Sequence, residues 1–438
     1  MSKWESIPLE ELAEIRVSNV DKKSRPGEKS VLLCNYMDVY SNEYIDSNLD
    51  FMQSTANFVE REKFKVSVGD VIITKDSETP CDIGIPTVVM EEIDELICGY
   101  HLALIKPNNE KVDSVYLAKQ LASNSVASYF SRRAAGSTRY GLSNGSIRNT
   151  AIPLAPREHQ TIIASILSTI DQTIEKAEAL IHKYQQIKTG LMHDLFTRGL
   201  TADGKLRPPR EQAPELYQET PIGWIPKEWV LVTIDDLIDG IEQGWSPDCE
   251  SESADYAEWG VLKTSAVTWD GFVRNQNKRL PKTLLPKLHY QVKADNLLVT
   301  RAGPNSRVGV ISLVKNDPGK LLISDKLYRL LPKRDVSNEY LELALSSQVT
   351  QRYLDGFKTG LAESQTNISQ AIIRKLVVVY PNDEERECFI IKLKTINKKI
   401  SSLKMELEKS ILIKQGLMHD LLTGKVSVKL DQAEPAYV

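Results

Sequence analysis

The sequence predicts an α+β protein with two similar mixed α/β domains, separated by two long helices that form an antiparallel coiled coil within the chain. Two observations predict this fold. The chain repeats itself at an offset of 226 positions, measured from Gly190 to Gly416. In addition, each half ends in a long segment whose apolar residues recur every seven positions. Two similar halves on such a coil would be related by a pseudo-twofold axis.

The repeat is clearest at the end of each half, where "GLMHDLFTRGL" begins at Gly190 and "GLMHDLLTGKV" begins at Gly416. At the same offset, "FKVSVGDVIIT" from Phe64 matches "YQVKADNLLVT" from Tyr290. With shifts of one or two positions, "GYHLALIKP" matches "SDKLYRLLP". The order and spacing of these segments indicate an internal duplication. The alternative is a pair of generic α/β domains that share only a helix ending.

The first part of each half is predicted to be a mixed domain, at residues 1–155 and 229–381. In the N-terminal half, "DVIIT", "PTVVM" and "HLALIKP" lie between clusters of Gly, Pro, Asn and Asp, which is typical of short strands. A helix is expected near "SVYLAKQLASNSVASYFSRR". Each domain should therefore contain a sheet with helical cover.

The second part of each half is predicted to be one long helix, at residues 156–200 and 382–425, starting near Arg157 and Asp383. A helix of about 40 residues is roughly 60 Å long, so this pair would be a spacer as well as a core. Residues 201–228, rich in Pro, Gly and charge, are expected to be a linker, and residues 426–438 a tail. The predicted seam, which is mostly apolar, consists of Ile163, Leu167, Ile170, Ile174, Ala177, Ile181, Tyr184, Lys188 and Leu191, with Phe389, Leu393, Ile396, Ile400, Leu403, Leu407, Ser410, Lys414 and Leu417 in the second helix.

The composition excludes several classes of protein. The chain is 41% hydrophobic and 26% charged, as in ordinary soluble proteins, and no apolar run is long enough to cross a membrane. Its N-terminus lacks the apolar core of a signal peptide, and its five dispersed cysteines argue against a disulfide framework or a zinc site. We therefore expect a cytoplasmic protein without membrane association. The net charge of −4 by itself does not suggest nucleic-acid binding.

No catalytic motif is found. "GLTADGKL" resembles a phosphate-binding loop, but Leu206 stands where Ser or Thr should bind magnesium, and the segment follows a helix rather than a strand. The glycine-rich dinucleotide motif, the amino-methyltransferase tetrapeptide and the Pro-Asp…Asp/Glu-x-Lys nuclease motif are absent. We expect no catalytic residues, no metal site and no cofactor.

The helix ending "GLMHDLLTGKV", the linker "GKLRPPREQAPELYQETPIGWIPKEW" and the two-half layout resemble the specificity subunit of type I restriction–modification enzymes. The resemblance spans the chain and is strongest in the helices and linker. It implies that each mixed domain is a target recognition domain for one half of a split, asymmetric sequence in double-stranded DNA. It also implies a non-catalytic subunit whose helices dock two methyltransferase subunits and, in the full complex, motor-nuclease subunits.

Two other functions remain open at this point: a coiled-coil adaptor that bridges two protein partners without DNA, and an enzyme with an unrecognised site. A DNA-binding chain should carry Arg-bearing loops on both domains. An adaptor should carry apolar or acidic patches there instead. An enzyme would need a polar pocket with converging titratable groups.

The candidate DNA-binding residues lie in two polar loops of each half, because Arg and Lys bind phosphate or guanine and amides suit adenine. Each could instead be a solvated loop residue. In the N-terminal half they are Lys75, Ser77, Arg132, Arg133, Ser137, Thr138, Arg139 and Tyr140, and in the C-terminal half Arg301, Asn305, Arg307, Lys358, Thr359, Gln365 and Asn367. The repeated helix ending offers adaptable apolar side chains for partner docking at Leu191, Met192, Leu417 and Met418.

Overall fold

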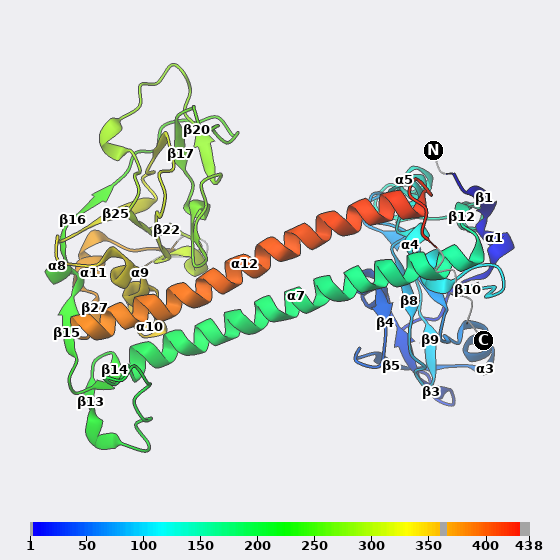
Figure 1. The fold of residues 1–438 in the computed structure, drawn as a ribbon, viewed down its shortest axis with the longest axis horizontal. Coiled ribbons are helices and arrows are strands. Elements are labelled where there is room, and N and C mark those ends of the chain that lie inside the picture. Colours follow the sequence, from blue (N-terminus) through cyan, green and yellow to red (C-terminus); the bar gives the residue numbers. More distant parts are fainter. Residues whose placement is uncertain (1–2, 360–365, 430–438) are drawn as a thin grey trace, which may run out of the picture. The chain divides into compact units, whose positions relative to one another are not determined.

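A computed structural model of the chain describes residues 3–359 and 366–429 (Figure 1). The chain divides into two compact units. Unit 1 comprises Met1–Ala179 and Lys404–Val438, and unit 2 comprises Leu180–Leu403. Helices α7 (Arg157–Thr197) and α12 (Asp383–Leu422) each contribute one end to each unit. The predicted class, two mixed domains with two long helices, is confirmed.

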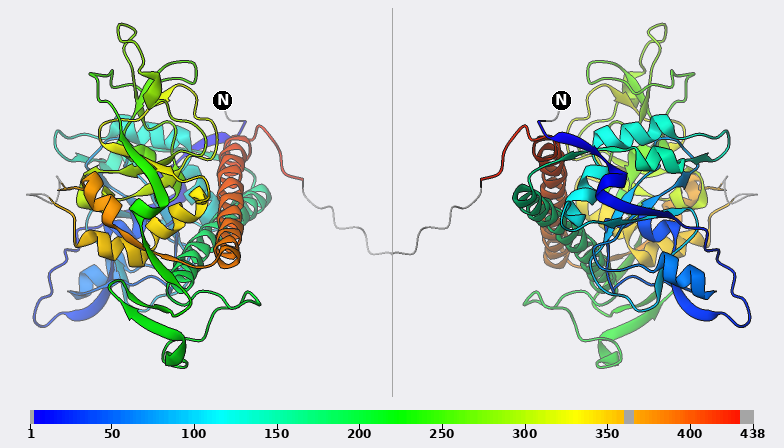
Figure 2. Two further views of the ribbon diagram at one scale, coloured as in Figure 1. Left: turned by 90° about the vertical axis from the view of Figure 1, so that its left-hand side faces the viewer. Right: turned by 90° about the vertical axis from the view of Figure 1, so that its right-hand side faces the viewer.

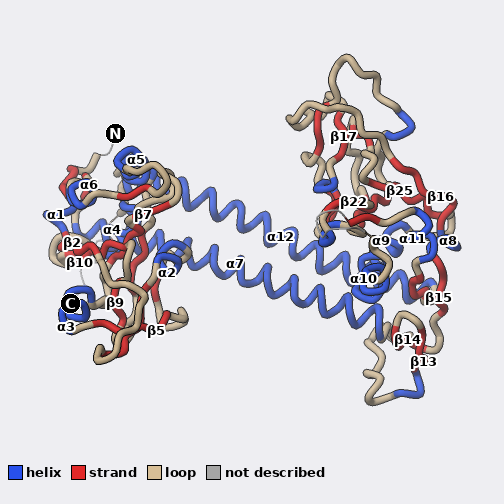
Figure 3. The backbone as a smooth tube through the Cα atoms, turned by 180° about the vertical axis from the view of Figure 1, so that it is seen from behind, coloured by secondary structure: helices blue, strands red, loops and turns tan. Residues whose placement is uncertain are grey.

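Unit 1 is built on a five-stranded sheet of order β2-β10-β6-β8-β4 and a three-stranded sheet of order β5-β3-β9 (Figure 3). The pairs β1–β12 and β7–β11 form two further ribbons. The strands are β1 (Glu5–Pro8), β2 (Ala13–Val17), β3 (Lys29–Cys34), β4 (Tyr44–Ile45), β5 (Met52–Ala56), β6 (Val71–Thr74), β7 (Asp76–Ser77), β8 (Pro86–Val89), β9 (Leu96–Cys98), β10 (Leu102–Pro107), β11 (Tyr140–Gly141) and β12 (Ala151–Leu154). The helices are α1 (Leu9–Leu12), α2 (Tyr36–Tyr40), α3 (Phe58–Phe64), α4 (Ser114–Leu121), α5 (Asn124–Arg133) and α6 (Asn144–Arg148).

Unit 2 has a four-stranded sheet of order β16-β25-β21-β23 and a three-stranded sheet of order β20-β17-β24, with ribbons β15–β27, β22–β26, β18–β19 and β13–β14. The strands are β13 (Tyr217–Thr220), β14 (Gly223–Pro226), β15 (Val230–Thr233), β16 (Ile238–Gln243), β17 (Gly260–Leu262), β18 (Val267–Thr268), β19 (Gly271–Phe272), β20 (Asn277–Arg279), β21 (Leu297–Thr300), β22 (Ala302–Gly303), β23 (Ile311–Leu313), β24 (Leu321–Leu322), β25 (Leu327–Pro332), β26 (Thr366–Asn367) and β27 (Val377–Tyr380). The α-helices are α8 (Ile234–Leu237), α9 (Asn338–Ser346), α10 (Gln348–Asp355) and α11 (Gln370–Lys375), with 3₁₀ turns η1 (Pro214–Leu216), η2 (Thr264–Ala266), η3 (Leu288–Tyr290) and η4 (Asn305–Arg307).

The two units repeat the same topology. Strands β2, β10, β6 and β8 of unit 1 have the order of β16, β25, β21 and β23 in unit 2. The correspondence extends to single hydrogen bonds. The Gly84 amide donates to the Thr74 carbonyl at 2.9 Å, and the Gly309 amide donates to the Thr300 carbonyl at 2.9 Å. The duplication predicted from the sequence is therefore present in the fold.

The helix expected near "SVYLAKQLASNSVASYFSRR" is two helices, α4 and α5. The chain breaks at Ser123, whose backbone is extended (φ −65°, ψ 149°). In unit 2 the same break falls at Ser347, whose hydroxyl accepts a hydrogen bond from the Thr350 amide. Serine side chains compete for backbone donors and favour helix starts over helix interiors, which explains why apolar spacing alone did not locate the break.

The two long helices run antiparallel within each unit. All predicted seam positions are buried or half-buried. In unit 2, Phe196 near the end of α7 meets Phe389 near the start of α12 edge-to-face, with ring centroids 5.5 Å apart. In unit 1, Leu167 near the start of α7 and Leu421 at the end of α12 belong to one core. The same antiparallel pairing of helix ends thus occurs twice.

A buried ionic cluster attaches both helices to the domain of unit 1. The Lys119 ammonium lies 2.5 Å from the Asp171 carboxylate of α7, and Lys414 of α12 lies 2.8 Å from the same group. The Tyr44 hydroxyl donates to Asp171 at 2.6 Å. Burial favours the neutral acid, but the two ammonium groups outweigh it and lower the pKa of Asp171. Burial and the Asp171 carboxylate together raise the pKa of Tyr44.

The segment 201–228, expected to be a linker, is part of unit 2 and carries the β13–β14 hairpin (Figure 2). Its Arg207 guanidinium lies 2.6 Å from the Glu385 carboxylate, and both side chains are buried. Glu385 also accepts hydrogen bonds from the Trp229 indole at 2.9 Å and the Leu200 amide at 2.6 Å. One carboxylate in the first turn of α12 therefore ties the end of α7, the linker and the start of the domain together.

Replacing Glu385 with Ala should lower the free energy of unfolding by about 3–5 kcal/mol, because it removes the buried partner of the Arg207 charge and leaves only the exposed Glu228, 2.7 Å away. Urea titration followed by circular dichroism measures this loss. The matched control is Glu384→Ala, which removes an exposed carboxylate from the same helical turn and should cost about 1 kcal/mol or less. Equal losses for the two variants would show that the Glu385 cluster does not stabilise unit 2.

Replacing Gly84 with Ala should destabilise the chain more than replacing Gly27 with Ala. Both glycines have left-handed backbone angles, φ 78° and φ 84°. A Cβ at Gly84 would lie 2.3 Å from the buried Phe130 ring, whereas nothing lies within 4 Å at Gly27. Overpacking of a core adds about 1–3 kcal/mol to the conformational cost that the two variants share. Equal melting temperatures would contradict this packing of the β6–β8 turn on α5.

Candidate nucleic-acid interface

In unit 1 the two loops that hold the predicted DNA-binding residues pair with each other. The short strands β7 and β11 pair antiparallel, with Ser77 opposite Tyr140 and Asp76 opposite Gly141. The Leu142 amide donates to the Lys75 carbonyl at 2.9 Å and extends the pairing. Lys75, Ser77 and Tyr140, which are far apart in sequence, are therefore neighbours.

Unit 2 repeats this arrangement. Strands β22 and β26 pair antiparallel, with Ala302 opposite Asn367. The Ile368 amide donates to the Arg301 carbonyl at 2.9 Å, as Leu142 does to Lys75 in unit 1. We call each of these two-stranded ribbons, with the cation that precedes it, a junction. The junctions of units 1 and 2 place Lys75 and Arg301 in equivalent positions.

A third segment contributes to each junction, and sequence reasoning missed it. The Lys75 amide donates to the His101 carbonyl at 2.8 Å, and the Arg301 amide donates to the Lys326 carbonyl at 2.9 Å. His101 and Lys326 lie immediately before the equivalent strands β10 and β25. The sequence did hold a signal for this third segment. His101 and Lys326 occupy the same place in the matched segments "GYHLALIKP" and "SDKLYRLLP", just before the strand.

The unit 1 junction brings three titratable side chains together. The His101 Nδ1 atom lies 2.5 Å from Asp76 Oδ2, and the Lys75 ammonium lies 3.6 Å from Asp76 Oδ1. His101 has a left-handed backbone with φ 73°, a conformation that costs energy for a residue with a side chain. Such strain persists only where surrounding contacts hold it, and it is concentrated at functional sites.

The unit 2 junction borders an open polar cavity of about 580 Å³. Its lining is Thr264, Arg301, Ala302, Gly303, Lys326, Thr366 and Asn367. The Arg301 guanidinium lies over the Tyr328 ring at 5.5 Å and donates to the Asp325 carbonyl at 3.1 Å. These contacts hold the guanidinium at the cavity, which is also lined by the exposed Lys326, whose ammonium lies 3.6 Å from the Asp325 carboxylate.

The other nominated residues have different surroundings. Arg132 and Arg133 are exposed in the last turn of α5, where Arg133 lies over the Tyr129 ring. Ser137, Thr138 and Arg139 are exposed in the following loop.

In unit 2, Arg307 donates hydrogen bonds to the Thr264 and Val267 carbonyls. Lys358 pairs with Asp355 and donates a hydrogen bond to the Asn305 carbonyl. Thr359 pairs with Asn367, and Gln365 lies outside the described residues. Arg307 and Lys358 thus support the loops of unit 2.

The four residues nominated for partner docking are half-buried. Leu191 and Met192 pack against the core of unit 2, and Leu417 and Met418 pack against the core of unit 1. The long helices expose other apolar side chains that the heptad search did not consider, because these lie off the seam. They are Leu180, Ile187, Ile391, Met405, Ile411, Leu412 and Ile413.

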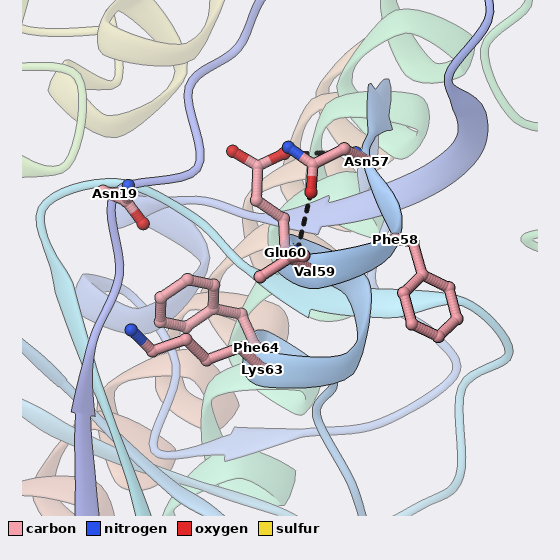
Figure 4. A pocket seen from close by; sticks show the side chains of 7 residues that line it. All are labelled: Asn19, Asn57, Phe58, Val59, Glu60, Lys63 and Phe64. Atoms are coloured by element: carbon pink, nitrogen blue, oxygen red, sulfur yellow. Dashed lines mark hydrogen bonds between the residues drawn. The ribbon is translucent and has the colours of Figure 1, made fainter.

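A hollow at α3 is lined by side chains that include Phe58, Lys63 and Phe64, and Phe58 points away from the other two (Figure 4). Within residues 3–359 and 366–429, no group of three or more His, Cys, Asp or Glu side chains could hold a metal ion. In the same part of the chain, no helix is both long and apolar enough to cross a bilayer.

Comparisons with known proteins agree with this architecture. Residues 1–184 match the family model described as the type I restriction modification DNA specificity domain. The chain is 38% identical over 224 residues to the type I restriction enzyme EcoEI specificity subunit of Escherichia coli, covering 51% of this chain and 36% of that subunit. It is 23% identical to the putative type I restriction enzyme MjaX specificity subunit of Methanocaldococcus jannaschii, covering 97% of this chain and 94% of that subunit.

A solved structure shares the fold along the chain. The crystal structure of the type I restriction–modification S subunit from M. genitalium has a TM-score of 0.58 and 13% identity, covering 96% of each chain. The duplicated mixed domains, the paired long helices, the matched family model and these relatives lead to one conclusion. Residues 1–184 match the type I restriction modification DNA specificity domain, and the chain is similar to type I restriction enzyme specificity subunits along its length.

Proposed function

We propose that the chain is the DNA-recognition subunit of a type I restriction–modification assembly, and that each unit binds one part of a two-part duplex target. The observation that carries this proposal is the junction, which is built twice from the same hydrogen bonds and has a cation, Lys75 or Arg301, at the same place. We take residues 1–155 and 229–381 as the two target recognition domains.

The net charge of −4 requires that DNA binding rely on local cations. Cations at the junctions support the proposal: they are Lys75 and the exposed Arg139 in unit 1, and Arg301 and Lys326 in unit 2. Cations at equivalent positions suit phosphates, which are the same at every base pair. An adaptor that bridges two proteins has no support from the family match, whose description names DNA specificity.

In this proposal the chain is non-catalytic and uses no cofactor or metal. It orients DNA for methyltransferase and motor-nuclease subunits, which supply the chemistry. The apolar residues exposed on α12, together with the half-buried Leu417 and Met418, form a surface for such a partner. Met405 and Leu412 are 62% and 67% exposed and are seven residues apart, so they lie on one face of the helix.

Exchanging residues 1–155 for those of a relative with a different target should change one part of the recognised sequence and leave the other part unchanged. The measurement is sequencing of methylated adenines in cells that express each chain with its methyltransferase subunit. The unexchanged chain, expressed in the same way, is the control and should methylate a single two-part sequence. A change in both parts, or methylation without sequence preference, would contradict one-unit, one-part recognition.

Replacing Met405 and Leu412 together with Ser should reduce co-purification of the methyltransferase subunit by about tenfold or more, because burial of such side chains contributes roughly 1.5–3 kcal/mol each. Melting temperature should change little, since both side chains are exposed. The control is Leu285→Ser, which removes an 88% exposed apolar side chain from a loop of unit 2. Full retention of the partner by the double variant would show that this face of α12 does not bind it.

A further inference from the structure

The two junctions can be compared residue by residue. Ser77 opposite Tyr140 in unit 1 corresponds to Gly303 opposite Thr366 in unit 2, and the cross-strand pair next to the cation also differs. In unit 1 this pair is Asp76 opposite Gly141, and in unit 2 it is Ala302 opposite Asn367. Each of these two pairs has one polar side chain. It is Asp76, on the first strand of the ribbon, in unit 1, and Asn367, on the second strand, in unit 2. The polar group is a carboxylate in one unit and a carboxamide in the other.

The local geometry shows that the pair has room for one polar side chain in unit 1. A Cβ on Gly141 would lie 2.8 Å from Asp76 Oδ1, so the carboxylate occupies the space that a second side chain would need. His101 holds the other carboxylate oxygen at 2.5 Å. In unit 2 the small Ala302 and Gly303 leave the cavity open beside the exposed Asn367.

Residues that both units share cannot distinguish two different half-sites, whereas residues that differ at a matched position can. Lys75 and Arg301 are the cations that the two junctions have in common, which suits contact with phosphate. The carboxylate and the carboxamide differ in hydrogen-bonding capacity. An ionised carboxylate only accepts hydrogen bonds, whereas a carboxamide both donates and accepts.

This difference selects between bases in the major groove. Cytosine presents an amino donor, which a carboxylate can accept. Adenine presents an amino donor beside the N7 acceptor, which repels a carboxylate but suits the donor and acceptor of Asn or Gln. Guanine and thymine present an acceptor oxygen that offers a carboxylate no hydrogen bond.

We infer that the cross-strand pair is a specificity-determining position in each unit, where Asp76 selects cytosine in one half-site and Asn367 selects adenine in the other. This inference rests on the proposed function, because it names the bases that the same two junctions recognise. Lys75 and His101 are then positioning residues for Asp76, since both lie against its carboxylate.

The test is selection of duplexes from a randomised DNA library by the full chain and its variants, followed by sequencing. Asp76→Asn converts the carboxylate into a carboxamide of the same shape and should change cytosine to adenine at one position of one half-site. Asn367→Asp should make the reverse change in the other half-site. Each preference should shift by about tenfold or more, the discrimination typical of such a contact.

The control is Glu78→Gln, which removes one exposed negative charge two residues after Asp76 and should leave both half-sites unchanged. Melting temperatures establish that each variant is folded, and the unmutated half-site serves as an internal reference. A wild-type chain that selects no two-part sequence would overturn the proposed function itself. A wild-type chain that selects one, with folded Asp76→Asn and Asn367→Asp variants that select the same sequence, would overturn this inference alone.

Discussion

The core of each mixed domain is completed by the end of a helix that begins in the other half of the chain. Leu421 and Leu422 of α12 belong to the core of unit 1, and Leu195 and Phe196 of α7 belong to the core of unit 2. Fully burying such side chains contributes roughly 1.5–3 kcal/mol each, so neither domain completes its core without the other half. The repeated "GLMHDL" ending is explained by this contact, which is made twice.

The shared backbone of the two junctions lets the units differ in chemistry at matched positions. Hydrogen bonds from Leu142 to Lys75 and from Ile368 to Arg301 fix both junctions in the same register. Within that register, side chains can change without moving the backbone. A duplicated protein can thus present two different polar groups, from Asp76 and from Asn367, at matched cross-strand pairs. A constant backbone with variable side chains suits a subunit that binds two different DNA sequences.

Much of the fold could be predicted from the sequence, because helix and strand periods are local signals. The heptad positions and the strand runs were confirmed where apolar spacing was regular. The packing of segment 201–228 could not be predicted, since it depends on Arg207 meeting Glu385 across the fold. Lys75 and Arg301 could be selected as candidates from their residue type. His101 and Lys326 could not, because they join the junctions through backbone hydrogen bonds between segments that are distant in the sequence. Conversely, Arg307 and Lys358 were nominated by charge, whereas the structure engages them in loop contacts.

The central claim is that each unit binds its own segment of the duplex through its own junction. Footprinting of the full chain on its selected duplex, with Lys75→Ala and Arg301→Ala variants, tests this claim most directly. We expect two protected segments, with one weakened in the Lys75 variant and the other weakened in the Arg301 variant. Uniform weakening of both segments by either variant, or one continuous footprint that neither variant alters, would contradict the account.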